Sequence, residues 1–378
     1  MMKKTVCIIQ PRLPAYRVPV FEALRDSLSA QEIGLGLVYS KAAGAEALRK
    51  DEGDLDWATV VPNRRWSLGD IELSWQPALR HAAAADLIIV PHENRFLLNY
   101  LLLLRKPFTG QKLAFWGHGA NMHHLNSPRI RDRWKSVLLK LPDWWFGYTN
   151  LSRDILIQSG FSGEKITVVQ NAVDTGDVRR CAAQVTEDDL KALRKKLRLS
   201  GRHVGVFCGS LYPGKRIDIV VAAAKQVRKR IRDFELVIIG TGPEEAVAVE
   251  ASRQDSWIHF AGRRQGYEKV LYMKLGQLLF LPYIVGLAIL DAFALGIPLL
   301  TMDNGSHSVE IAYLRNSING IMTNNTVDAF ADAAVALLND PAKMKAMSGQ
   351  CLSDSETYTV AKMVENFTEG IASCLAGA

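Results

Sequence analysis

The stretch FLPYIVGLAILDAFALGIPLL, Phe280 to Leu300, has one charged residue, Asp291. Its length is compatible with a membrane span, because about twenty apolar residues cross a hydrocarbon core. Gly286 stands before its centre and Gly296 after it, which is typical of a short helix of roughly ten residues between a loop and a strand. A carboxylate is also costly in lipid. We therefore expect a buried helix of a globular domain, with Asp291 serving a ligand site as the alternative to plain packing.

The composition of the 378-residue chain bounds its class. Hydrophobic residues make up 48% and charged residues 22%, as in globular proteins, and the length allows two domains. The formal net charge of +7 allows anionic partners: nucleic acid, phosphorylated small molecules or an acidic membrane surface. Five cysteines lack paired spacing, and the first apolar run is too short for a secretory leader, so we expect a cytoplasmic protein without a disulfide framework or zinc cluster.

Short apolar runs alternate with helical segments and predict an α/β protein with parallel sheets. In the first half the expected strands are Thr5–Ile9, Ile33–Tyr39, Asp86–Val90, Lys112–Trp116, Trp144–Thr149 and Ile166–Gln170. In the second half they are Val204–Cys208, Glu235–Gly240, Trp257–Gly262, Gln277–Pro282, Ile297–Met302 and Gly320–Thr323. Two doubly wound, Rossmann-like domains facing across a cleft are therefore expected, with ligands at the carboxyl ends of the strands.

The domain boundaries follow from composition. We expect a first domain over 1–174, a linker helix over 175–200, a second domain over 201–355 and a closing helix over 356–378. Thr186 and Asp189 are spaced as a capping box at the start of the linker helix.

The turn after Val204–Cys208 carries the residues expected for a phosphate site. Gly209 permits close approach of the backbone, and Lys215 with Arg216 supplies two cations at a helix start. An ordinary glycine turn before a basic helix is the alternative. A second turn, Gly240–Pro243, opens another helix and places Gly242 near the same edge.

Asp291 has a coherent role beside such a phosphate site. If the helix begins near Gly286, the amides of Gly286, Leu287 and Ala288 are available to a ligand, and Asp291 lies about one turn further along. One turn matches the separation between the diphosphate and the ribose hydroxyls of a nucleotide. The pattern therefore indicates a nucleotide site in which Asp291 accepts hydrogen bonds from ribose.

In this order, the motifs CGSLYPGKRIDIVVAAA, VIIGTGP, IHFAG, LPYIVGLAILDAFALGIPLL and NSINGIM resemble the donor half of retaining GT-B glycosyltransferases of family GT4. In the first half, FGYTNLSRDILIQSG and KITVVQNAVD are similar to the segment by which those enzymes leave the acceptor domain. The resemblance extends over most of 113–323. It implies a donor site for a nucleotide diphosphate sugar. Within the family, the chain resembles most the enzymes that build bacterial surface polysaccharides.

The chain departs from the family pattern at two positions. The family has two acidic residues separated by seven others, and here Tyr283 replaces the first, which contacts the transferred sugar, while Asp291 matches the second, which holds ribose. Ser210 replaces an arginine, whereas Lys215 matches the family lysine. Arg216 is a candidate substitute for the lost cation. Donor binding thus carries over better than recognition of the sugar.

His118 is the first-half candidate for catalysis. It lies between two glycines after an expected strand, and the resemblance implies that it contacts the donor sugar and assists the departing diphosphate. His123 and His124 could contact the acceptor or belong to a solvated loop. A metal site is not expected, because no third ligand has a motif-like position.

Two further basic segments suggest anionic partners. Arg12, Tyr16 and Arg17 follow the first strand and could grip an anionic acceptor, with an ordinary basic loop as the alternative. The segments Arg95–Lys106 and Ser127–Tyr148 mix cations with leucine and tryptophan, which suits an anionic membrane interface. We expect the first domain to dock there and reach a lipid-linked acceptor, an amphipathic helix being the simpler alternative.

The leading prediction is a metal-independent, cofactor-free glycosyltransferase that moves a sugar to a glycan or lipid-linked glycan. Lys215, Arg216 and the amides of Gly286 and Leu287 would stabilise the leaving diphosphate. A catalytically silent sugar-nucleotide-binding subunit, made credible by Tyr283, and a nucleotide-sugar epimerase are the alternatives. Nucleic acid is not expected as a partner, because the basic residues form no recognised binding module.

Overall fold

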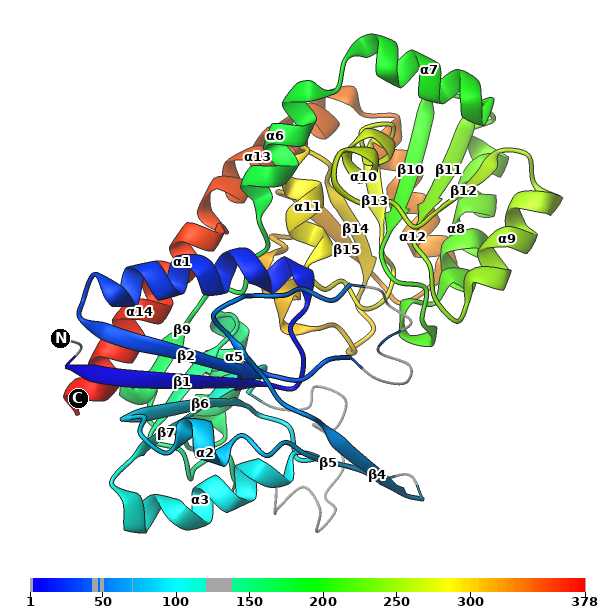
Figure 1. The fold of residues 1–378 in the computed structure, drawn as a ribbon. Helices are drawn as coiled ribbons and strands as arrows, with labels where there is room; N and C mark the ends of the chain where they lie inside the picture. Colours follow the sequence, from blue (N-terminus) through cyan, green and yellow to red (C-terminus); the bar gives the residue numbers. More distant parts are fainter. Residues whose placement is uncertain (1–2, 43–46, 48–50, 70, 120–137, 378) are drawn as a thin grey trace. The chain divides into compact units, whose positions relative to one another are not determined.

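The computed structural model describes residues 3–42, 47, 51–69, 71–119 and 138–377. The chain forms two compact units, coloured along the chain in Figure 1: unit 1 comprises Met1–Asn171 with Val360–Ala378, and unit 2 comprises Ala172–Thr359. The last helix, α14 (Val360–Ala376), therefore returns to the first unit. The segment expected as a linker holds two helices, α6 (Thr175–Gln184) and α7 (Glu187–Leu197), and both belong to unit 2.

Unit 1 is built on a seven-stranded parallel sheet of order β3-β2-β1-β6-β7-β8-β9. Its strands are β1 (Lys4–Gln10), β2 (Ile33–Tyr39), β3 (Thr59–Val60), β6 (Leu87–Pro91), β7 (Lys112–Gly117), β8 (Trp144–Gly147) and β9 (Ile166–Val168). A separate antiparallel hairpin is formed by β4 (Arg64–Leu68) and β5 (Ile71–Trp75). The sequence patterns did not predict β3, β4 or β5, because these strands lack an apolar run.

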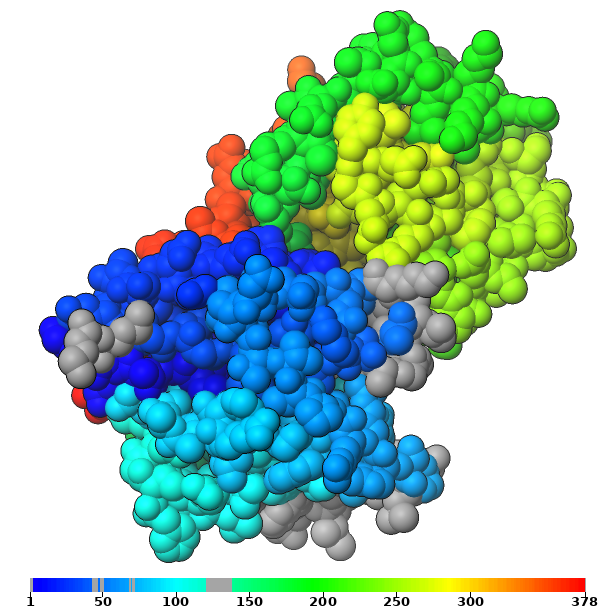
Figure 2. All heavy atoms as spheres, in the orientation of Figure 1, coloured from blue at the N-terminus to red at the C-terminus, as the bar shows by residue number. Residues whose placement is uncertain are grey.

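Helices cover both faces of this sheet. On one face α1 (Val18–Ser29) packs along α14, and on the other lie α2 (Leu79–Ala82) and α3 (Leu97–Thr109) (Figure 1). The second face has an apolar core in which Ala82 and Leu102 pack with Leu156 of α5 (Asn150–Gln158). Figure 2 shows the residues of α3, in cyan, at the surface of the unit.

Unit 2 is a six-stranded parallel sheet of order β12-β11-β10-β13-β14-β15, the doubly wound order. Its strands are β10 (His203–Cys208), β11 (Phe234–Ile239), β12 (Ile258–Gly262), β13 (Leu278–Phe280), β14 (Leu299–Met302) and β15 (Gly320–Thr323). Its other helices are α8 (Ile217–Arg230), α9 (Glu245–Gln254), α10 (Gly266–Met273), α11 (Ala288–Ala294), α12 (Val327–Leu338) and α13 (Pro341–Thr357). Every predicted strand is confirmed within three residues at either end.

The apolar stretch from Phe280 to Leu300 forms the end of β13, a loop, the helix α11 and the start of β14. The helix spans only Ala288–Ala294, and within the described residues no helix combines the length and apolarity that crossing a membrane requires. The buried helix is therefore confirmed. The capping box is confirmed as well: the Thr186 hydroxyl accepts from the Asp189 amide at 3.1 Å, and the Asp189 carboxylate accepts from the Thr186 amide at 2.9 Å.

Candidate functional site

Glycines bring two loops of unit 2 together at the carboxyl edge of the sheet. The amide of Leu211, in the turn after β10, donates to the carbonyl of Thr241, in the turn after β11, at 2.9 Å. Gly242 has φ 158°, and a Cβ there would lie 2.4 Å from the Leu211 carbonyl oxygen. Gly242 is thus required for packing between the loops, and its predicted contact with the donor stays a prediction, as do those of Gly209 and Ser210.

Lys215 links the turn after β10 to the loop after β13. Its side chain is only 7% exposed, and its ammonium donates to the carbonyl of Val285 at 3.1 Å and to that of Ile284. Burial lowers the pKa of Lys215 to about 8, although the nearby Glu310 carboxylate opposes that shift. The site therefore contains a buried ammonium that is charged at neutral pH and lies against the loop preceding α11.

Arg216 is differently placed. It takes the left-handed conformation (φ 50°), pairs with the Asp218 carboxylate at 2.7 Å, and lies over the Tyr283 ring with 5.2 Å to the centroid. The Tyr283 hydroxyl donates to Asn325 Oδ1 at 3.4 Å. Arg216 is therefore partly neutralised by Asp218, which limits it as the substitute for a lost cation.

The helix α11 begins two residues later than expected. Leu287 is its N-cap, and the amide of Gly286 (φ 62°) donates to the Ser308 hydroxyl at 3.0 Å. The expectation of a free Gly286 amide is therefore wrong, because the loop after β14 occupies it. The role predicted for the Gly286 amide in diphosphate binding stays a prediction that would require Ser308 to move, and the role predicted for Leu287 stays a prediction as well.

Asp291 has a partner that the sequence did not reveal. Its Oδ2 lies 3.0 Å from Nζ of Lys269, in α10, and its side chain is 16% exposed. Burial disfavours the charge on Lys269, but the Asp291 carboxylate and smaller contributions from other neighbouring groups together raise the pKa of Lys269. Lys269 was missed because it stands in an amphipathic helix pattern that carries no motif.

The loop after β14 was also missed. The Asn304 amide donates to the Pro282 carbonyl at 3.0 Å, and His307 Nε2 contacts the Met302 carbonyl at 2.6 Å. His307 is buried, and its Nδ1 has no hydrogen-bond partner among the described residues. This loop therefore supports the Pro282–Gly286 loop and adds a buried acceptor beside it.

In unit 1, His118 follows β7 directly, as predicted. Its exposed imidazole packs edge-on against the Tyr148 ring, with 4.7 Å between centroids. The next residue, Gly119, has φ 87°, and a Cβ there would lie 2.9 Å from the Ser152 carbonyl oxygen. The chain thus needs glycine at this turn, which places His118 at the carboxyl edge of the sheet.

Two of the acceptor residues predicted in unit 1, Arg12 and Arg17, bond to other side chains of that unit. Arg17 is 5% exposed, donates to Asn171 Oδ1 at 2.6 Å, and lies 4.9 Å from the centre of the Trp116 ring. The prediction that Arg17 grips an acceptor is therefore wrong, because the guanidinium is interior. Arg12 pairs with Asp51 at 2.7 Å, whereas Tyr16 is exposed and keeps its predicted role as a prediction.

The basic segment of the first half differs from the expectation where the structure describes it. His123 and His124, with residues 127–137 of the basic segment, lie outside the described residues. Trp144 and Trp145 are buried in β8, where their indole nitrogens donate to Thr167 and to the Leu139 carbonyl. The interpretation of these tryptophans as membrane-facing is therefore wrong, because they belong to the core.

Residues 202–340 match the profile of a family described as glycosyl transferases group 1, and the resemblance deduced from the motifs is confirmed for this part of the chain. A GDP-mannose-dependent alpha-(1-6)-phosphatidylinositol monomannoside mannosyltransferase of Mycobacterium tuberculosis is 27% identical over 169 residues. That match spans 41% of this chain and 43% of the relative, less than half of either.

Solved structures match over nearly the whole chain. HepE from Anabaena, determined with UDP, has a TM-score of 0.70 at 16% identity and covers 98% of this chain and 100% of its own. Sucrose-phosphate synthase from Thermosynechococcus elongatus has a TM-score of 0.71 at 12% identity, with full coverage of both chains. The predicted GT-B fold of two Rossmann-like domains is thereby confirmed.

Proposed function

We propose that the protein is a glycosyltransferase that moves a sugar from a nucleoside diphosphate sugar to a hydroxyl of a glycan or lipid-linked glycan. The observation that carries the proposal is a pair of lysines at the carboxyl edge of unit 2, of which Lys215 is buried and Lys269 is partly buried. Lys215 there lies against the loop before α11, and Lys269 holds Asp291 within that helix. Both belong to the segment that matches the glycosyl transferase family.

In this mechanism Lys215 stabilises the negative charge that develops on the leaving diphosphate, and Asp291 accepts hydrogen bonds from the ribose hydroxyls. The bond between the sugar's anomeric carbon and the diphosphate oxygen breaks. A bond from the acceptor oxygen to that carbon forms on the same face, with retention, and the hydroxyl proton passes to the departing phosphate. Protein cations serve where a metal otherwise would, so the reaction is metal-independent, and His118 contacts the donor sugar.

The names of similar proteins bear on donor and acceptor. HepE binds UDP-glucose in one structure, and the mycobacterial relative is named for GDP-mannose and a phosphatidylinositol monomannoside. A uridine or guanosine donor and a glycolipid acceptor are therefore the first to test. A glycolipid acceptor would also place the protein peripherally at the inner face of the cell membrane.

The first experiment is thermal stabilisation of the protein by a panel of nucleoside diphosphates and their sugars, since a ligand that binds the native state raises its melting temperature. We expect one base to give a clear shift. Asp291→Ala should weaken that ligand by about 1–3 kcal/mol, the contribution of charged hydrogen bonds. An unchanged affinity would reject the ribose role of Asp291.

The second experiment tests His118 once a donor is known. His118→Ala should lower turnover about 100-fold with little change in donor affinity, because its contact is with the reacting sugar. His81→Ala, at an exposed histidine of α2 in unit 1 that has no predicted role, serves as the matched control and should leave kcat within a few fold. Full activity of His118→Ala would return this histidine to a structural role.

A catalytically silent sugar-nucleotide-binding subunit is the second candidate. It is favoured by Tyr283, whose ring lies under Arg216 at the position where the family has a carboxylate. Nucleotide binding without hydrolysis or transfer, for every donor and acceptor tried, would support this candidate. Tyr283→Glu would then be expected to restore turnover.

A further inference from the structure

Ser308, which follows β14, has a hydroxyl that is used as an acceptor but not as a donor. Its Oγ accepts from the Gly286 amide at 3.0 Å, and it donates to no acceptor within the part of the chain that the structure describes. Ser308 is the N-cap of the 3-10 helix η6 (Val309–Tyr313), yet its side chain makes no capping hydrogen bond there. A serine hydroxyl has one hydrogen to donate, so that of the half-buried Ser308 is available to a ligand.

The loop between β14 and η6 holds Ser308 in a supported position. The Asn304 amide group donates to the Pro282 carbonyl at 3.0 Å, which joins this loop to the one after β13. The residue before Ser308, His307, is only 5% exposed, and its Nε2 lies 2.6 Å from the Met302 carbonyl. A carbonyl can only accept, so Nε2 carries the proton and anchors the loop. The Ser308 hydroxyl can therefore meet a ligand without rearrangement of its surroundings.

The ammonium of Lys215 also lies close to Gly286. A Cβ placed on Gly286 would be 3.9 Å from Nζ of Lys215, which donates to the carbonyls of Ile284 and Val285. The Glu310 carboxylate, in η6, favours the charged form of this ammonium. An ammonium and a hydroxyl with a hydrogen to donate thus adjoin the same glycine, which suits the oxygens of a phosphate group.

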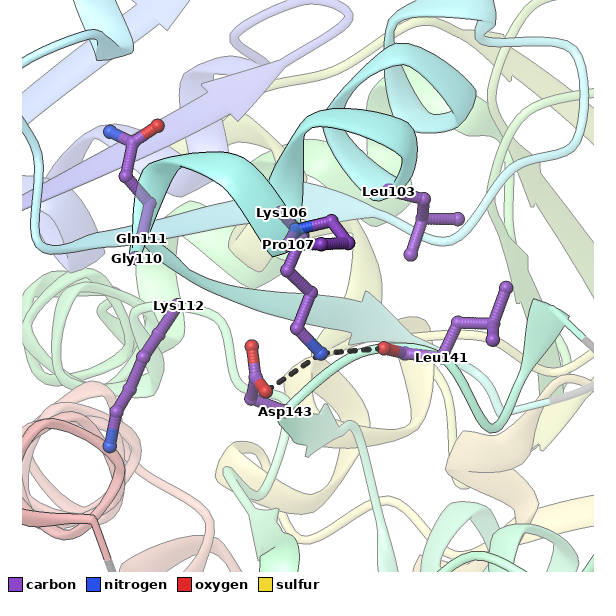
Figure 3. Close-up of a pocket in the computed structure, with 8 residues that line it drawn as sticks. All are labelled: Leu103, Lys106, Pro107, Gly110, Gln111, Lys112, Leu141 and Asp143. Carbon is purple, nitrogen blue, oxygen red and sulfur yellow. Dashed lines mark hydrogen bonds and ion pairs between the residues drawn. The ribbon is translucent and has the colours of Figure 1, made fainter.

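A recess in unit 1 shows a lysine in a different situation (Figure 3). The recess measures about 490 Å³, and Lys106 extends in it toward the Asp143 carboxylate, at 2.7 Å. The positive charge of Lys106 is therefore balanced by a bonded carboxylate. The hydrogen-bond partners of Lys215 are uncharged carbonyls, which orient its ammonium and leave its charge for a ligand.

We propose that Ser308 binds the diphosphate of the donor, its Oγ accepting from the Gly286 amide while its hydroxyl donates to a diphosphate oxygen beside Lys215. This role of Ser308 rests on the proposed function and deepens it, because the contact first predicted for the Gly286 amide passes through a side chain. A hydroxyl that accepts from an amide is polarised and becomes a better donor, since linked hydrogen bonds strengthen one another. Its bond to an anionic oxygen is charge-assisted and therefore stronger than a neutral one.

Calorimetry with the nucleoside diphosphate identified by thermal stabilisation tests this role. Ser308→Ala should weaken its binding by about tenfold or more, because a hydrogen bond to a charged group is lost. Affinity for the parent nucleoside, which has base and ribose but no phosphate, should be unchanged when it is titrated directly at millimolar concentrations. Unchanged diphosphate affinity would overturn the contact, and an equal loss for both ligands would mean general damage to the loop. A rise in diphosphate affinity would also overturn it, because Ser308 would then compete for the Gly286 amide.

Two further variants separate the hydroxyl from the structure of the loop. Ser308→Thr keeps the hydroxyl, and the extended backbone there (φ −70°, ψ 163°) accepts a β-branched residue, so affinity should return to within a few fold of wild type. Ser306→Ala is the matched control and should bind the diphosphate normally, because the Ser306 hydroxyl donates to the Asn304 carbonyl within the same loop, at 3.5 Å. Equal losses in Ser308→Thr and Ser308→Ala, or a similar loss in Ser306→Ala, would reject the Ser308 hydroxyl as the donor.

Asp291→Ala, measured alongside, distinguishes failure of this role from failure of the proposed function. Asp291 is proposed to bind ribose, so its loss should weaken the nucleoside and the diphosphate alike. Weakening of both ligands by Asp291→Ala, with no effect of Ser308→Ala, would overturn the role of Ser308 alone. Absence of any nucleotide binding by the wild-type protein would overturn the proposed function and the role of Ser308 together.

Discussion

The cations at the carboxyl edges of the two sheets differ in the groups that they bond to. In unit 2, Lys215 and Lys269 are bound to loops and side chains that border the candidate donor site: carbonyls before α11 in one case, Asp291 in the other. In unit 1, Arg12 and Arg17 are paired with Asp51 and Asn171 of their own unit. The comparison teaches that cations with a similar sequence context near a strand end differ in where their partners lie, and only in unit 2 do these partners border the candidate donor site.

The largest effect on this comparison should come from Lys215→Ala. We expect kcat/KM to fall by about 100- to 1000-fold, because the ammonium stabilises charge on the leaving group. Steady-state kinetics with the donor identified above measures this loss. Arg216→Ala is the control and should cost much less, because Asp218 already pairs with its guanidinium. Equal losses in both variants would remove the distinction between the two cations.

Arg17→Met tests the other side of the comparison. The buried guanidinium hydrogen-bonds to Asn171 and lies over the Trp116 ring. Its removal should lower the free energy of unfolding by about 2–3 kcal/mol, measured by urea denaturation. Once folded, the variant should keep its acceptor KM. Unchanged stability with weakened acceptor binding would restore the role first predicted for Arg17.

The low pKa of Lys215 gives a pH signature. Because burial holds this pKa near 8, the ammonium is charged below that pH and loses its proton above it. Affinity for a nucleoside diphosphate sugar, whose diphosphate has no group that titrates in this range, should therefore be steady well below pH 8 and fall above it by up to about tenfold per pH unit. Calorimetry of wild type and Lys215→Arg, which stays charged, measures this. A flat profile in wild type would separate Lys215 from the diphosphate.

The smallest effect is expected for Lys269→Met. Loss of the ion pair should weaken nucleotide binding by on the order of 1 kcal/mol, because a mostly buried Asp291 carboxylate loses its counter-ion. Lys269→Arg, which keeps the positive charge, should reverse the deficit. Lys274→Met, on the same side of unit 2 and bonded only to the Ala182 carbonyl among the described contacts, is the control.

Much of the fold could be predicted because parallel strands buried on both faces are continuous apolar runs. The strand β3 was not predicted because it has only two residues, and β4 and β5 were not predicted because they carry polar residues such as Arg64 and Arg65 and form a ribbon apart from the main sheet. Their pairing depends on cross-strand neighbours, which a single segment does not disclose.

The residues of the candidate site could be predicted where the neighbouring sequence marks a turn or a helix start. Lys215 and Asp291 stand in turns and helix starts that glycine and proline mark in the sequence. Lys269, Asn304 and Ser308 could not be found in this way, because in all three bonds the partner is 22 residues away and lies in a separate helix or loop. Arg17 was misassigned for the same reason, as Asn171 is remote along the chain.

The return of α14 to unit 1 limits how this architecture can be rearranged. Phe367 of α14 stacks on Phe146, at 4.6 Å between centroids, and packs edge-on against Trp116. A gene fragment ending at residue 171 would leave these aromatic rings uncovered, so exchange of a first half between related genes would have to bring its own last helix. Recombination at a single crossover would mismatch that helix with its sheet, which ties the two ends of the gene together in inheritance.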